Sequence, residues 1–100
     1  MTKIKLYVEG IADEIKGAKE YAEKYLWYKA KGNTTRSSRY KEMATQELEH
    51  ASNLHEFATE DIESLERVYP EIPNDMMEAW DKSHKEYVEK VAWVKQMLSM

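Results

Sequence analysis

The chain has 100 residues, of which 42% are hydrophobic and 34% charged, and its formal net charge is −4 at pH 7. This balance is typical of one globular domain, residues 1–100, and the 3 Gly and 2 Pro residues favour helices over sheets. Cysteine is absent, which excludes disulfides, thiolate metal sites and cysteine catalysis; with no basic block either, nucleic acid is not an expected partner.

The sequence contains no apolar run near the ~20 residues that a membrane-spanning helix needs. Its N-terminal segment becomes polar by Glu9, so no signal peptide is expected. We therefore expect a cytoplasmic protein without a membrane partner. Because a chain of this size buries a modest core, association into dimers or larger assemblies is also expected.

The first predicted element is a helix over residues 2–31, ended by the glycine C-cap Gly32. Residues at helical spacing form an apolar stripe whose only charged member is Glu14. Glu20 is an alternative candidate for a functional carboxylate, but its neighbours form a polar face, which favours Glu14. The stripe consists of Tyr7, Ile11, Glu14, Ala18, Tyr21, Tyr25 and Tyr28.

A second helix is predicted over residues 35–69, with hydroxyl N-cap candidates at its start. Its predicted apolar stripe contains a carboxylate, Glu47, and an imidazole, His50. Burial of an uncompensated charge is costly, so these side chains need partners, and a metal ion suits both. A structural Glu–His hydrogen bond is the alternative. The stripe reads Met43, Glu47, His50, Leu54 and Phe57, with Ala44, Leu48, Ala51, Ala58 and Ile62 on its shoulder.

The third helix is predicted over residues 74–99, after two prolines and with capping side chains at its start. Its apolar stripe has one polar interruption, His84, and Asp81 lies three residues earlier. We interpret these two residues as a buried hydrogen-bonded pair, with a second metal site, with or without Asp61, as the weaker alternative. His55 is interpreted as a core histidine.

The three helices form an all-α, up-down-up array, because short connections favour antiparallel neighbours. From Glu14 to the first break is 18 residues, or ~27 Å of helix, and from the break to Glu47 and His50 is ~20–24 Å. These three residues are therefore expected to face each other. On the third helix the same level falls near Val94 and Leu98, which are apolar, and His84 falls level with the neighbourhood of Asp61.

One chain thus offers half of a carboxylate-bridged dinuclear site. A second copy, related by a twofold axis, would supply the other Glu14, Glu47 and His50. The sequence therefore predicts a homodimer or a higher homo-oligomer.

The spacing of these residues resembles that of a known superfamily. Glu14 is followed by Tyr21 seven residues later, and Glu47 of the Glu-x-x-His motif comes 33 residues on. Residues 40–51 look like the second helix of a rubrerythrin-like domain. The chain therefore resembles the ferritin-like superfamily of rubrerythrin-type di-iron carboxylate proteins over residues 4–65. It departs from the full pattern because it has three helices and one Glu-x-x-His motif.

The resemblance implies a ferritin-like half-bundle that is completed by dimerisation, with two iron ions per dimer interface and manganese or zinc as alternatives. Glu47 would bridge the metals, and Glu14 and His50 would be terminal ligands. Tyr21 would hydrogen-bond a ligand or supply an electron, although a core tyrosine is an equal reading. The implied activity is ferroxidase: oxidation of Fe(II) by dioxygen or peroxide.

By architecture, encapsulated ferritins would be the nearest relatives within that superfamily. Their shell-targeting tail is not visible in this sequence, so neither an encapsulin shell nor iron storage is expected.

Two other functions are compatible with the sequence. A non-enzymatic helical accessory protein of bacterial or phage origin would use its buried Glu and His to specify pairing. A ferritin-like fold that keeps its ligands would instead bind zinc or manganese structurally.

Overall fold

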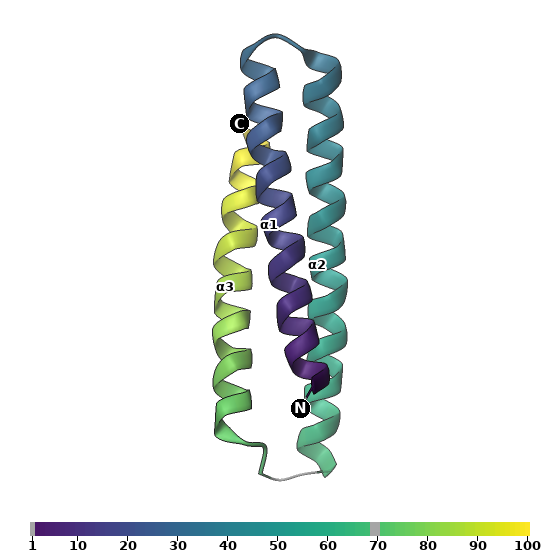
Figure 1. The fold of residues 1–100 in the computed structure, drawn as a ribbon, viewed down its shortest axis with the longest axis vertical. Coiled ribbons are helices and arrows are strands. Elements are labelled where there is room, and N and C mark those ends of the chain that lie inside the picture. The colour runs from purple at the N-terminus through teal and green to yellow at the C-terminus, as the bar shows by residue number, and fades with distance from the viewer. Residues whose placement is uncertain (1, 69–70) are drawn as a thin grey trace.

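A computed structural model describes residues 2–68 and 71–100 of the chain. Three long helices run up, down and up: α1 (Thr2–Ala30), α2 (Thr34–Val68) and α3 (Asn74–Ser99) (Figure 1). The all-α prediction and the helix boundaries are confirmed to within a residue, apart from the predicted end of the second helix, which falls outside the described residues. No helix in residues 2–68 and 71–100 combines the length and the apolar character that crossing a bilayer requires.

The connection between α1 and α2 is a compact pair of helix caps. Gly32 has a positive φ of 75°, and its amide donates to the Lys29 carbonyl at 3.0 Å, while the Asn33 amide donates to the Tyr28 carbonyl at 3.0 Å. This is the Schellman pattern, in which glycine takes the left-handed position. The Asn33 side chain then accepts the Arg36 amide at 3.1 Å, so asparagine caps α2, not the hydroxyl residues that were predicted.

The start of α3 also differs from prediction. Pro73 occupies the N-cap position, and no side chain there makes a capping hydrogen bond. The Pro73 carbonyl instead accepts the amides of Met76 and Met77 at 3.1 and 3.2 Å. A fixed proline φ suits this position, so the backbone alone starts the helix.

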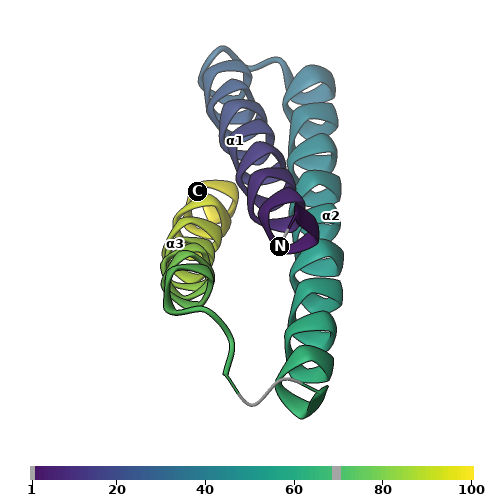
Figure 2. The same ribbon diagram turned by 60° about the horizontal axis from the view of Figure 1, so that its bottom comes forward.

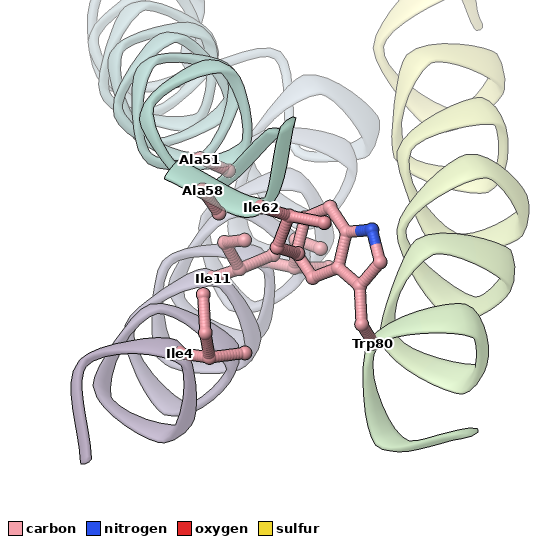
Figure 3. Packing of buried hydrophobic residues seen from close by; sticks show 7 residues of the cluster. Ile4, Ile11, Ala51, Ala58, Ile62 and Trp80 are labelled. Carbon is pink, nitrogen blue, oxygen red and sulfur yellow. The ribbon is translucent and has the colours of Figure 1, made fainter. Parts of the chain in front are cut away.

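The core is built on small residues along the line where α1 meets α2. Ala18 and Ala22 of α1 and three alanines of α2 are fully buried, which allows the two backbones to approach closely. Larger side chains fill the space on either side and contact α3. One cluster consists of Ile4, Ile11, Ile15, Ala51, Ala58, Ile62 and Trp80 (Figure 3), and the other of Ala18, Ala22, Tyr25, Ala44, Leu48, Val94 and Leu98.

Helix α3 packs mainly on α1 and stands apart from α2 over much of its length (Figure 2). Trp80 crosses from α3 to the α1–α2 pair and packs against Ile62 (Figure 3). At the other end, Val94 and Leu98 share a cluster with Leu48. This confirms the predicted register, in which apolar residues of the third helix lie level with the Glu-x-x-His motif.

The buried face of α2 is rotated relative to the prediction. Met43 and Phe57, expected at the centre of the apolar stripe, are 37% and 50% exposed. The predicted shoulder is the actual core, with Ala44, Ala51 and Ala58 fully buried. The reason is that α1 packs on the alanine side of α2, which leaves the stripe that contains Met43 and Phe57 at the outer edge of the α1–α2 contact.

The predicted Asp81–His84 hydrogen bond is wrong. Both residues are exposed, and His84 Nδ1 lies 2.8 Å from His55 Nε2 on α2. The His55 ring stacks on Tyr87 with 4.3 Å between centroids. Helix α3 stands apart from α2, and the two imidazoles, one from each helix, meet in the space between them. Asp61 takes no part in this contact, since its carboxylate lies 3.1 Å from the ammonium group of Lys3.

The His55–His84 contact predicts a pH dependence of stability. Burial, together with His84, lowers the pKa of His55 below its ordinary value of 6.5. The folded chain therefore binds fewer protons than the unfolded chain, so this contribution is present above pH 6.5 and lost as the pH falls. In metal-free buffer, urea titrations of His55→Gln should show a smaller loss of unfolding free energy on acidification than the wild type.

His50→Gln is the matched control, because that imidazole lies at the surface of the same helix. An equal acid sensitivity in the wild type and in His55→Gln would contradict the assignment.

Candidate metal centre

Three side chains converge on the α1–α2 pair: Glu14 from α1, and Glu47 and His50 from successive turns of α2. One ligand atom of each lies within 4.8 Å of the others. His50 Nδ1 is 3.5 Å from a carboxylate oxygen of Glu14 and 4.0 Å from one of Glu47. The structure thus brings together the three residues that the helix register placed at one level.

The group lies on the side of the α1–α2 pair away from α3. His50 and His55 are separated by about 140° around the helix, given 3.6 residues per turn, and His55 is the one that contacts α3. Glu14 and Glu47 are half-buried, while the His50 side chain is 57% exposed. The group therefore opens outward to solvent and is not enclosed by the three helices of one chain.

The two carboxyl groups are electrostatically opposed. The main cause that raises the pKa of Glu47 above its ordinary value is a hydrogen bond that the protonated Glu47 carboxyl donates to Glu14, and burial and the charge of Glu14 act in the same direction. The His50 imidazole acts in the opposite direction but more weakly. Glu47 therefore holds its proton more tightly than an isolated carboxyl does, which is the expected response of a carboxyl that lies against another one.

Gly17 makes room for this arrangement, and the sequence analysis missed it. A Cβ atom at this position would lie 2.9 Å from Oε2 of Glu47, closer than real Cβ contacts allow. The Glu47 carboxylate thus occupies the volume that a side chain would fill. The available signal was a glycine in the middle of a 29-residue helix, where it is unfavourable by about 1 kcal/mol relative to alanine.

The other predicted site residues lie outside this group. Tyr21 is half-buried two turns beyond Glu14, and its ring packs on Tyr40 with 6.1 Å between centroids. Glu20 is exposed and lines a surface hollow near the end of α1 together with Trp27. Of the two α1 carboxylates weighed from the sequence, the structure brings Glu14 to the motif.

No family model, curated protein or solved structure matches the chain. The resemblance to ferritin-like proteins stays a prediction, and the candidate site rests on its own geometry.

The raised pKa of Glu47 predicts how the metal-free protein responds to pH. The folded chain binds more protons than the unfolded chain, so this contribution to stability is present below the ordinary value of 4.5 and is lost as the pH rises through the raised pKa. Glu14→Gln removes the opposing charge. Its unfolding free energy, measured with urea under chelating conditions, should fall less than that of the wild type as the pH rises past 4.5.

Glu42→Gln, an exposed carboxylate on α2, is the control. If Glu14→Gln and Glu42→Gln behave alike, the two site carboxyls do not share a proton.

Proposed function

We propose that the chain is a ferritin-like metal-binding protein in which Glu14, Glu47 and His50 of two copies hold a dinuclear iron centre. The observation that carries this proposal is the convergence of two carboxylates and an imidazole within 4.8 Å at a surface that opens outward. Manganese and zinc are the alternatives.

The donor set fits a first-row divalent metal ion. Carboxylate oxygen and neutral imidazole nitrogen are both ligands for iron, manganese and zinc. A cation between Glu14 and Glu47 would favour the ionised form of Glu47 and so counteract the causes that raise its pKa. The slot at Gly17 holds the Glu47 carboxylate beside Glu14, which favours Glu47 as the bridging ligand.

The surroundings of the group support a dimer. Met43 and Phe57 flank Glu47 and His50 along one stripe of α2 and are exposed. Exposed large apolar residues beside a polar centre are typical of protein interfaces. Three donors from one chain leave coordination positions open on the outward side, where a second copy would bring its own three. The apolar side chains would then exclude water from the paired site.

The proposed activity is ferroxidase. Bound iron would supply the oxidation of Fe(II) by dioxygen or peroxide. Glu14, Glu47 and His50 of each copy would hold the ions, with Glu47 bound in its ionised form. The open positions leave access for the oxidant.

The second candidate function is a non-enzymatic helical interaction protein. The observation in its favour is that the apolar residues Met43 and Phe57 are exposed, which by itself offers a surface for a partner. In that case the Glu–His group would determine how the helices associate with a partner and would not bind an ion.

The deciding experiment combines molecular mass with metal content. After growth with iron, light scattering and elemental analysis should find a dimer or larger assembly with about two irons per dimer interface, the nuclearity of a paired carboxylate site. Glu47→Ala and His50→Ala should each lose the iron, because each removes a ligand. A metal-free oligomer that neither substitution changes would favour the interaction protein.

Gly17 offers a test that removes no ligand. Gly17→Ala should raise the free energy of unfolding of the metal-free protein by up to ~1 kcal/mol, since alanine is the better helix former. The same variant should bind iron at least about tenfold more weakly, or ~1.4 kcal/mol, because the new Cβ displaces the Glu47 carboxylate. Equilibrium dialysis and urea titration measure the two effects.

Gly10→Ala is the matched control on the same helix. Its Cβ would lie 3.2 Å from a methyl group of Leu54 and would touch no ligand. Iron affinity should therefore stay at the wild-type value. Equal iron binding by both alanine variants would show that the Gly17 slot does not position Glu47.

A further inference from the structure

His55 and His84 form a pair of imidazoles that takes no part in the candidate metal centre. His55 lies on α2 about 140° around the helix from His50, and its side chain contacts α3. Its Nε2 atom lies 2.8 Å from Nδ1 of His84 on α3. The pair therefore connects two helices that have few other contacts with each other.

The two nitrogens of this pair face each other. The ring centroids are 5.0 Å apart and the nitrogens 2.8 Å apart, so the centroids are 2.2 Å further apart than the nitrogens. That difference is close to two imidazole ring radii, which places both nitrogens near the line between the ring centres. In the neutral pair, one nitrogen donates its N–H to the lone pair of the other.

The aromatic rings of α3 hold the His55 imidazole in this orientation. Tyr87 stacks on it with centroids 4.3 Å apart and 11° between the planes, and Trp80 stacks on it at 5.2 Å and 28°. A side chain that packing already holds in place is suited to bind a ligand at a fixed geometry. Burial and His84 also lower the pKa of His55, which favours the neutral imidazole that metals require.

The number of donors limits which ion the pair can hold. Within residues 2–68 and 71–100, the group of three or more His, Asp or Glu ligands is Glu14, Glu47 and His50, so the His55–His84 pair offers two donors alone. Zn²⁺ takes four ligands and would find half of them here. Cu(I) and Ag(I) are filled d¹⁰ ions that are satisfied by two donors on one line.

Charge and ligand type also favour a monovalent copper or silver ion. Imidazole is a ligand for copper, and the chain has no cysteine whose thiolate would compete for the ion. One positive charge costs less to remove from water than two, which matters because His55 is half-buried. The faces of Trp80 and Tyr87 are an environment that attracts cations.

We propose that His55 and His84 form a two-coordinate site for Cu(I), in which the ion replaces the proton between the two facing nitrogens. The ring that donated its N–H then carries this proton on its other nitrogen, so no proton is lost and no electron is transferred. The nitrogens move from 2.8 Å to roughly 4 Å apart, which is two metal–imidazole bonds. The site does not depend on the candidate iron centre.

Ag(I) is the probe for this site, because it shares the linear geometry and does not change its oxidation state. Titration calorimetry of the full chain, freed of metals and in chloride-free buffer, should find one tightly bound ion per chain. His55→Gln and His84→Gln should each weaken binding at least ~100-fold, since loss of even an outer-shell partner of a metal costs roughly 10–100-fold. His84 is exposed, so its substitution does not disturb the core.

His50→Gln is the matched control, because the chain has 3 His and this substitution removes the one outside the pair. It should keep the Ag(I) affinity of the wild type. Equal affinity in all three variants, or loss of binding in His50→Gln alone, would overturn the proposal.

The geometry has its own readout. In ¹H–¹⁵N spectra of the imidazole rings, Ag(I) should shift Nε2 of His55 and Nδ1 of His84, and the other nitrogen of each ring should carry the proton. Zn²⁺ bound by the same pair as tightly as Ag(I) would overturn the two-coordinate assignment.

The bound ion should also stabilise the fold, since it binds the folded chain across α2 and α3. The urea midpoint of the wild type and of His50→Gln should rise with Ag(I), and that of His84→Gln should not. Cu(I), kept reduced without oxygen and measured by competition with a chromogenic chelator, should follow the same order. Binding of Ag(I) without binding of Cu(I) would overturn the assignment to copper.

Discussion

The close approach of α1 and α2 is the constraint on which the rest of the structure depends. Fully buried alanines line their contact, and Cβ atoms at the two internal glycines of α1 would lie 3.2 Å from Leu54 and 2.9 Å from Glu47 of α2. Because the backbones are this close, the side chains of Glu14 and Glu47 lie next to each other. The same packing that stabilises the helix pair therefore also brings the two carboxyl groups into an electrostatically unfavourable contact.

A bound cation would stabilise this contact between the Glu14 and Glu47 carboxyls. Two carboxyls and an imidazole meet at the edge of the helix pair, and the contact with Glu14 raises the pKa of Glu47. A divalent ion would bind these groups with full ligand bonds. The centre lies at the outer face of the helix pair, beside exposed Met43 and Phe57, and it opens to solvent.

Helix α3 divides the molecule into two faces with different roles. It supplies Trp80, Val94 and Leu98 to the core, mostly against α1, and it reaches α2 through the His55–His84 contact. The opposite face of the α1–α2 pair stays uncovered by this chain. The core is thus completed within one copy, whereas the candidate centre is left accessible.

The sequence by itself determined the three helices, their order and the level at which Glu14, Glu47 and His50 meet, because helix periodicity and rise are local properties of the backbone. The tertiary structure alone decided which stripe of α2 is buried, that His84 pairs with His55, and that Gly17 holds space for Glu47. These depend on how α3 leans and how closely two helices pack. Such distances arise between segments far apart in sequence, and no local pattern encodes them.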